Sequence, residues 1–88
     1  MNELDKRRKQ LLYRANHRGI KEMDIILGEF ARDRIGTLDN GDLDQLERLM
    51  EENDRELLSW FTGEQPVPAD MTSPLLDAIF AHCGARFR

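Results

Sequence analysis

The sequence contains little cysteine and little histidine. Cys83 is its one cysteine, and His17 and His82 are its two histidines among 88 residues. A single cysteine cannot form a disulfide within the chain, and these three residues do not have the spacing of a zinc site. His82 and Cys83 would point about 100° apart on a helix, which also argues against a shared metal. We predict no metal site and expect Cys83 to pack as a small apolar side chain.

The chain also lacks a long apolar run. No stretch approaches the roughly 20 apolar residues that span a bilayer, and the N-terminus has no apolar segment like that of a signal peptide. We therefore expect no membrane insertion, no signal or transit peptide, and a bacterial cytoplasmic location. Gly-rich phosphate loops, dinucleotide fingerprints and nucleophile–base pairs are missing too. This favours a protein that is not an enzyme, with no catalytic residue and no bound cofactor of its own.

The composition is typical of one small helical domain. With 40% hydrophobic and 34% charged residues, a chain of 88 residues can bury a core, but not a deep one. We predict a single domain over residues 1–88. Since the chain is too short for an extended cleft with a second domain, any activity should come from a surface or through a partner.

Charge is distributed unevenly along the chain. Residues 1–21 carry a net charge of +5, whereas residues 22–77 carry −11. A dipolar molecule of this kind would orient in the field of a complementary partner. The alternative is a pair of solvated helix faces with no further role.

Capping residues predict the first two helices, and no segment alternates like a strand. Asn2 is a good N-cap for a helix over residues 3–15, and residues 16–19 form a turn. A second helix then runs toward Gly36, which ends it. Its apolar stripe comprises Ile20, Met23, Leu27, Phe30 and Ala31.

The second half of the chain predicts three more helices. A third should occupy about residues 40–52. Asn53 and Glu56 have the spacing of a capping box for a short fourth helix that ends at Gly63.

Prolines make residues 63–71 an extended connector, and Pro74 opens a final helix that Gly84 stops. Residues 85–88 should fray. The predicted fold is therefore all-α, a compact bundle of about five short helices.

The most specific local pattern is R-G-x-x-E, formed by Arg18, Gly19 and Glu22 where the charge changes sign. Helical phasing places Glu22 roughly a third of a turn from the apolar stripe, so its carboxylate is available to solvent or to a partner. The alternative is a capping carboxylate at the positive end of the second helix.

The residues around this pattern resemble those of the SdhE family, called succinate dehydrogenase assembly factor 2 in eukaryotes. The resemblance runs from about Arg7 to Arg86 and is most specific around the R-G-x-x-E pattern. It rests on Leu12-Tyr13-Arg14, His17-Arg18-Gly19, Glu22-Met23-Asp24, Leu27, Phe30, Asn53-Asp54, Leu57 and Trp60.

The resemblance implies a helper protein that promotes covalent attachment of FAD to a histidine in the flavoprotein subunit of succinate dehydrogenase. Fumarate reductase is the second partner that it implies. FAD would be the cofactor of the partner, and we expect the free chain to be a monomer. Holding the flavoprotein in an attachment-competent conformation would suffice for this role.

The resemblance also implies that Arg18, Gly19 and Glu22 bind the partner. Arg18 would offer a bidentate guanidinium fork, or else pair with Glu22 one turn away. Gly19 would permit a positive-φ turn or a close approach of two backbones.

Three further residues are candidates for partner binding. His17 and Ile20 flank the pattern at positions where relatives often carry a basic residue and a methionine. Trp60 lies at the edge of an apolar face, where packing in the core is an equal alternative.

Two other functions remain open from the residues alone. The basic first helix could bind nucleic acid, although the acidic remainder and a pI of about 5.1 disfavour this. A generic protein-interaction module is the other alternative.

Overall fold

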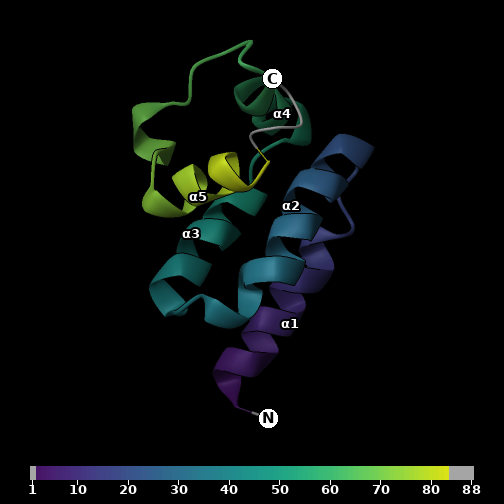
Figure 1. Ribbon diagram of the computed structural model, residues 1–88, viewed down its shortest axis with the longest axis vertical. Helices are drawn as coiled ribbons and strands as arrows, with labels where there is room; N and C mark the ends of the chain where they lie inside the picture. Colours follow the sequence, from purple (N-terminus) through teal and green to yellow (C-terminus); the bar gives the residue numbers. More distant parts are fainter. Residues whose placement is uncertain (1, 84–88) are drawn as a thin grey trace.

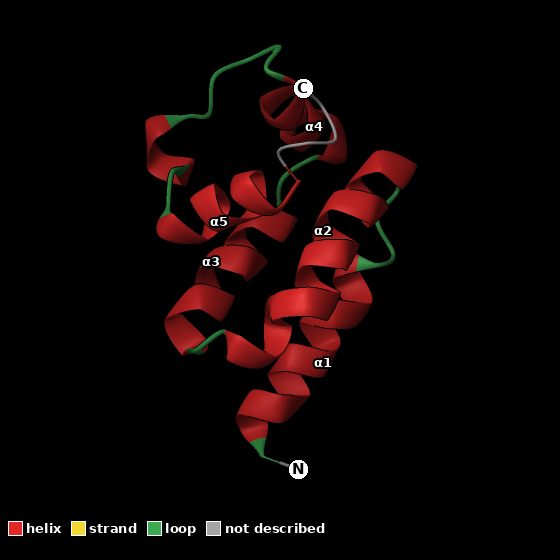
Figure 2. Ribbon diagram, viewed as in Figure 1, coloured by secondary structure: helices red, strands yellow, loops and turns green. Residues whose placement is uncertain are grey.

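Five α-helices and two short 3₁₀ turns make up the molecule in a computed structural model that describes residues 2–83 (Figure 1). The α-helices are α1 (Glu3–Ala15), α2 (Lys21–Arg34), α3 (Asn40–Met50), α4 (Asp54–Thr62) and α5 (Pro74–Cys83). The 3₁₀ turns are η1 (Ile35–Thr37) and η2 (Ala69–Met71). No strand occurs between residues 2 and 83 (Figure 2), and the predicted all-α fold is confirmed.

The helices enclose one core around α2. Helix α2 packs against α1, α4 and α5, while α3 packs against α1 and α5 (Figure 1). Because α2 has neighbours on several sides, it buries side chains over most of its length, from Met23 to Ala31. The core is completed mainly by leucines of α3, α4 and α5, together with Trp60 and Phe61. Cys83 belongs to this cluster and is 5% exposed, which confirms its predicted packing.

Caps explain where several of the helices begin and end. The Asn2 side chain accepts a hydrogen bond from the backbone N–H of Asp5 at 2.8 Å, as predicted for α1. Ser73 accepts one from Leu76 at 3.0 Å, which caps α5 just before its opening proline. Helix α4 ends at Gly63, whose φ of 83° is the left-handed conformation that favours glycine.

One detail of the predicted caps was wrong. The Asn53 side chain accepts a hydrogen bond from Arg55, so it caps α4 one residue earlier than a capping box would. A capping box does form at α3, where the Asp39 and Asp42 side chains each accept from the other residue's backbone N–H.

One predicted boundary and one predicted connector also differ. Helix α3 ends at Met50 rather than near residue 52, and side-chain donors of Arg18 take the Met50 and Glu52 carbonyls at this end. The connector after α4 contains η2, in which Met71 donates to the Pro68 carbonyl at 2.9 Å.

The predicted fraying of residues 85–88 lies outside the described residues. None of the helices in the described part of the chain has the length and apolar character needed to cross a membrane.

Candidate functional site

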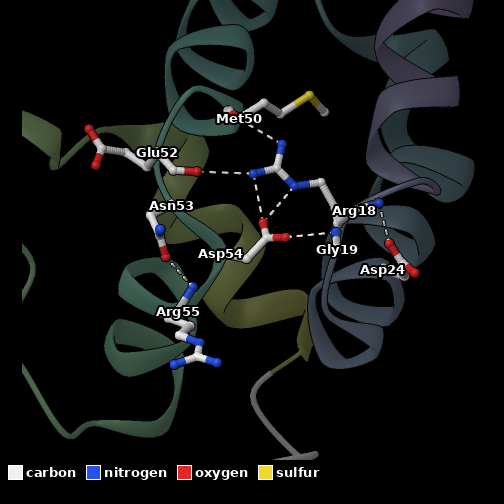
Figure 3. A network of polar contacts seen from close by, with 8 residues as sticks. All are labelled: Arg18, Gly19, Asp24, Met50, Glu52, Asn53, Asp54 and Arg55. Atoms are coloured by element: carbon white, nitrogen blue, oxygen red, sulfur yellow. Dashed lines mark hydrogen bonds and ion pairs between the residues drawn. The ribbon is translucent and has the colours of Figure 1, made fainter.

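The R-G-x-x-E residues lie in the loop between α1 and α2 and in the first turn of α2. This loop, residues 16–20, meets the junction of α3 and α4 (Figure 3). Two segments that are more than 30 residues apart in sequence therefore meet at Arg18. Some side chains at this place hold the loop in position, and others face solvent.

Arg18 points into the molecule. Its Nε donates to Asp54 Oδ1 at 2.7 Å, Nη1 donates to the Met50 carbonyl at 2.6 Å, and Nη2 donates to the Glu52 carbonyl at 3.0 Å (Figure 3). The side chain is only 12% exposed. Since the end of a helix leaves carbonyls without partners and carries partial negative charge, the guanidinium caps α3 both chemically and electrostatically. The alternative pairing of Arg18 with Glu22 is not formed among the described residues.

Asp54 receives both Arg18 and the residue after it. Its Oδ1 accepts the guanidinium, and its Oδ2 accepts the backbone N–H of Gly19 at 2.8 Å (Figure 3). The Asp54 carboxylate sits in the first turn of α4, where the helix dipole favours an anion. We call Arg18 and Asp54 the loop anchor.

Gly19 is exposed, and its backbone does not need glycine. Among the described residues only Gly63 has positive φ, so the first of the two alternatives for Gly19, a positive-φ turn, is not formed. A β-carbon at Gly19 would meet Asp54 Oδ2 at 3.5 Å, an ordinary van der Waals distance. The fold therefore leaves room for a small side chain here, and the space in front of Gly19 is open to an incoming surface.

Glu22 is exposed and forms no hydrogen bond or ion pair within the described part of the chain. The carboxylate that does cap the loop is that of Asp24, which accepts the backbone N–H of Arg18 (Figure 3). The expectation that Glu22 lies outside the core is confirmed, and the capping alternative belongs to Asp24 instead. Glu22 is thus a solvated carboxylate on a fixed turn.

The two neighbours of the pattern differ in exposure. His17 is exposed and stacks on Tyr13 with ring centroids 4.0 Å apart, while its Nδ1 donates to the Tyr13 carbonyl at 2.7 Å. Ile20 is half-buried and packs against the core. Tyr13, which is 64% exposed, is not among the residues that the sequence predicts to bind a partner. The available signal was its position off the apolar stripe of α1, about 200° from Leu11.

Trp60 lies in the core with 4% exposure. Its indole N–H is buried and finds no acceptor among residues 2–83. This burial supports the packing alternative for Trp60. We therefore define the docking edge as the surface formed by His17, Gly19, Ile20 and Glu22.

The basic charges of residues 1–21 divide into two groups. Three arginines are half-buried and held by acceptors within the fold: Arg7, Arg8 and Arg18. For Arg7, a hydrogen bond to Asp44 is the main cause of a raised pKa. Four bases are exposed and have no ion pair among the described residues: Lys6, Lys9, Arg14 and Lys21. The strongly basic segment therefore presents a modest positive surface.

Metal-ligating side chains do not cluster in the described region. No three His, Cys, Asp or Glu side chains between residues 2 and 83 come together as metal ligands. A shallow depression of about 550 Å³ on α1 is open to solvent, and its lining includes Lys9, Tyr13 and Arg14. The arrangement offers a solvated carboxylate beside an open glycine, which suits docking to another protein.

Comparisons with known proteins point to one family. A family model named Sdh5, described as "Flavinator of succinate dehydrogenase", matches residues 9–83. The FAD assembly factor SdhE of Acetobacter pasteurianus is 37% identical over 75 residues, which are 85% of this chain and 69% of that protein. The mitochondrial succinate dehydrogenase assembly factor 2 of Dictyostelium discoideum is 31% identical over 94% of this chain. The one from Danio rerio is 36% identical over 86%. The chain spans 59% and 49% of the length of these two mitochondrial relatives.

Proposed function

This chain belongs to the Sdh5 family of succinate dehydrogenase flavinators, and we propose that it promotes covalent attachment of FAD to the flavoprotein subunit of succinate dehydrogenase. The family match covers the loop anchor and the docking edge. The observation that carries the proposal is the exposed Glu22 carboxylate, which has no partner among the described residues and is held on a turn beside Gly19.

The chain acts as a helper, and the reaction belongs to the partner. Attachment joins the flavin to a histidine of the flavoprotein, which requires the two to be correctly positioned. A binding protein assists when it binds the attachment-competent conformation of the flavoprotein more tightly than other conformations. No residue of the docking edge needs to touch the flavin for this effect.

Glu22 and Gly19 supply the contact in this proposal. Glu22 accepts hydrogen bonds from a cationic or N–H group of the flavoprotein, and such charge-assisted bonds are stronger than neutral ones. Gly19 lets the partner's surface approach the loop backbone, because no side chain covers it. His17 and Ile20 add contact area on either side of the glycine.

The partner range and setting are part of the same proposal. Fumarate reductase is a second partner because it is a related flavoprotein. The free chain acts as a monomer and binds no FAD itself. We place it in the bacterial cytoplasm, which is consistent with its similarity to the Acetobacter protein.

The test is complementation in a bacterial host that lacks the gene. Covalent flavin survives denaturation, so its fluorescence in a denaturing gel measures attachment to the flavoprotein. We expect the wild-type gene to restore fluorescence and Glu22→Gln to restore at most about a tenth, since a lost charge-assisted hydrogen bond costs about 1.5–3 kcal/mol.

The matched control is Glu64→Gln. Glu64 is also exposed and has no contact among the described residues, but it follows α4 and lies outside the docking edge. This variant should restore full fluorescence. Wild-type levels of covalent flavin in the deletion strain would show that the proposed function is wrong.

A further inference from the structure

Asp54 connects α4 to the docking edge without being part of it. Its two carboxylate oxygens bind two consecutive residues of the loop, Oδ1 the Arg18 side chain at 2.7 Å and Oδ2 the Gly19 N–H at 2.8 Å (Figure 3). The bond to Gly19 spans 35 residues of sequence. The orientation of the Gly19 peptide is therefore set from a different helix.

Within the loop, the Gly19 N–H bonds to Asp54, whereas Asn16, His17 and Arg18 are held by other partners. Ile20 is the N-cap of α2 and makes no side-chain cap bond. Gly19 has the greatest backbone freedom of any residue type, so without an acceptor its peptide would sample several orientations. Asp24 fixes the N–H of Arg18, and Asp54 fixes the next one. Gly19 directly precedes the N-cap of α2 and lies three residues before Glu22 in the first turn of that helix.

The burial of the loop anchor separates this role from direct contact. The Asp54 side chain is 14% exposed and that of Arg18 is 12% exposed, so little of either is available to a partner. Both charged groups also have hydrogen-bond partners within the molecule, since the guanidinium binds three acceptors and the carboxylate binds two donors.

We propose that Asp54 is a positioning residue for partner binding, which fixes the Gly19 peptide so that Glu22 is presented in its binding orientation. This inference rests on the proposed function and adds to it a residue of α4 that the partner does not touch. It follows that Asp54 and Glu22 are energetically coupled in binding although they share no contact.

A double-mutant cycle tests the coupling. The Kd for the purified succinate dehydrogenase flavoprotein subunit is measured for the full-length wild type, Asp54→Asn, Glu22→Gln and the double variant. Asparagine has one side-chain oxygen, so it cannot accept from both Arg18 and Gly19 as the carboxylate does. We expect Asp54→Asn to weaken binding about tenfold and the double variant to be little weaker than the weaker single variant.

The control is Asp33→Asn. Asp33 pairs with His82 at 2.8 Å and also joins two helices, but it lies away from the loop. It should leave the Kd unchanged even where it lowers the melting temperature. Independent, additive losses from Asp54→Asn and Glu22→Gln would overturn the proposal, as would an unchanged Kd for Asp54→Asn.

Amide hydrogen exchange in the wild type provides a test that does not depend on a variant folding. We expect the Gly19 amide to exchange much more slowly than an unbonded exposed amide, and exchange at the unprotected rate would overturn the proposal. If wild type and Glu22→Gln bind equally, the docking edge of the proposed function fails. If Glu22→Gln alone weakens binding, only the role of Asp54 fails.

Discussion

Asn16 lies so close to Gly28 that a β-carbon on this glycine would fall 2.5 Å from the Asn16 side-chain oxygen. Asn16 ends α1, and Gly28 lies in the middle of α2. The amide cannot easily move away, because its nitrogen donates to the Leu12 carbonyl at 2.8 Å and its oxygen accepts from Arg32 at 2.9 Å. The close approach of α1 and α2 therefore depends on the missing side chain of Gly28.

We predict that Gly28→Ala destabilises the protein. Overpacking costs about 1–3 kcal/mol, and the better helix propensity of alanine returns up to about 1 kcal/mol. The expected net loss is about 1 kcal/mol, or a fall in melting temperature of about 4–8 °C. Thermal unfolding followed by circular dichroism measures it. An unchanged melting temperature would mean that the Asn16 side chain can move away from the new β-carbon without loss of stability.

Gly19 should behave in the opposite way. Because it is exposed and a β-carbon there makes only ordinary contact, Gly19→Ala should change the free energy of unfolding by less than about 1 kcal/mol. Gly19→Arg should keep the fold but lower flavinylation in the complementation assay, because a long side chain would separate the two surfaces. A parallel loss of melting temperature and flavinylation in Gly19→Arg would instead assign the glycine a structural role.

Arg18→Lys is expected to be a damaging substitution. A lysine ammonium cannot reproduce the planar fork that reaches Asp54 and the Met50 and Glu52 carbonyls together. A part-buried carbonyl left without a donor costs about 1–3 kcal/mol, and lysine can still reach one of the acceptors, so urea unfolding should show a loss of at least about 1 kcal/mol. Arg7→Lys is the control, since Arg7 makes a more exposed ion pair with Asp44 and lysine keeps the charge, so this variant should unfold close to the wild-type midpoint.

Trp60 should matter for stability more than for binding. Trp60→Ala removes a buried ring and should cost about 3–5 kcal/mol, much of the stability expected for a domain of this size. Trp60→Phe keeps part of the apolar contact and also removes a buried N–H that has no acceptor among residues 2–83. If Trp60→Phe stayed folded but lost affinity for the flavoprotein, Trp60 would be a contact residue after all.

The nucleic-acid alternative is testable with a gel retardation assay. Within the described part of residues 1–21, four basic residues are exposed and have no ion pair. This is a small positive surface for binding phosphates, and the whole chain carries a net charge of −4. We expect no retarded band with duplex or single-stranded DNA at about 0.15 M salt. A complex that persists at this salt concentration would revive the alternative.

Local signals predicted the helices well because their causes are local. Asn2 accepts its hydrogen bond three residues away, and Gly63 stops α4 through its own backbone conformation. The cap on the end of α3 was missed because its donor is Arg18, which lies 32 residues from Met50. A cap supplied by a distant side chain leaves no local signal in the sequence.

The candidate site shows the same limit. Phasing correctly separated Glu22 from the core, since that depends on the helix alone. It could not show that Arg18 pairs with Asp54, 36 residues away, instead of with Glu22 one turn away. Nor could it show which glycine was constrained by packing, because Gly28 meets Asn16 only when two helices cross.

The capping of α3 by Arg18 has a consequence for the bound state. The loop conformation and the α3–α4 junction share the same hydrogen bonds, so their equilibria are linked. Thermodynamic reciprocity then requires that, if opening of the junction weakens partner binding, partner binding opposes opening of the junction by the same coupling free energy. Occupancy at Glu22 should therefore slow the transient opening of a helix end that the partner never contacts.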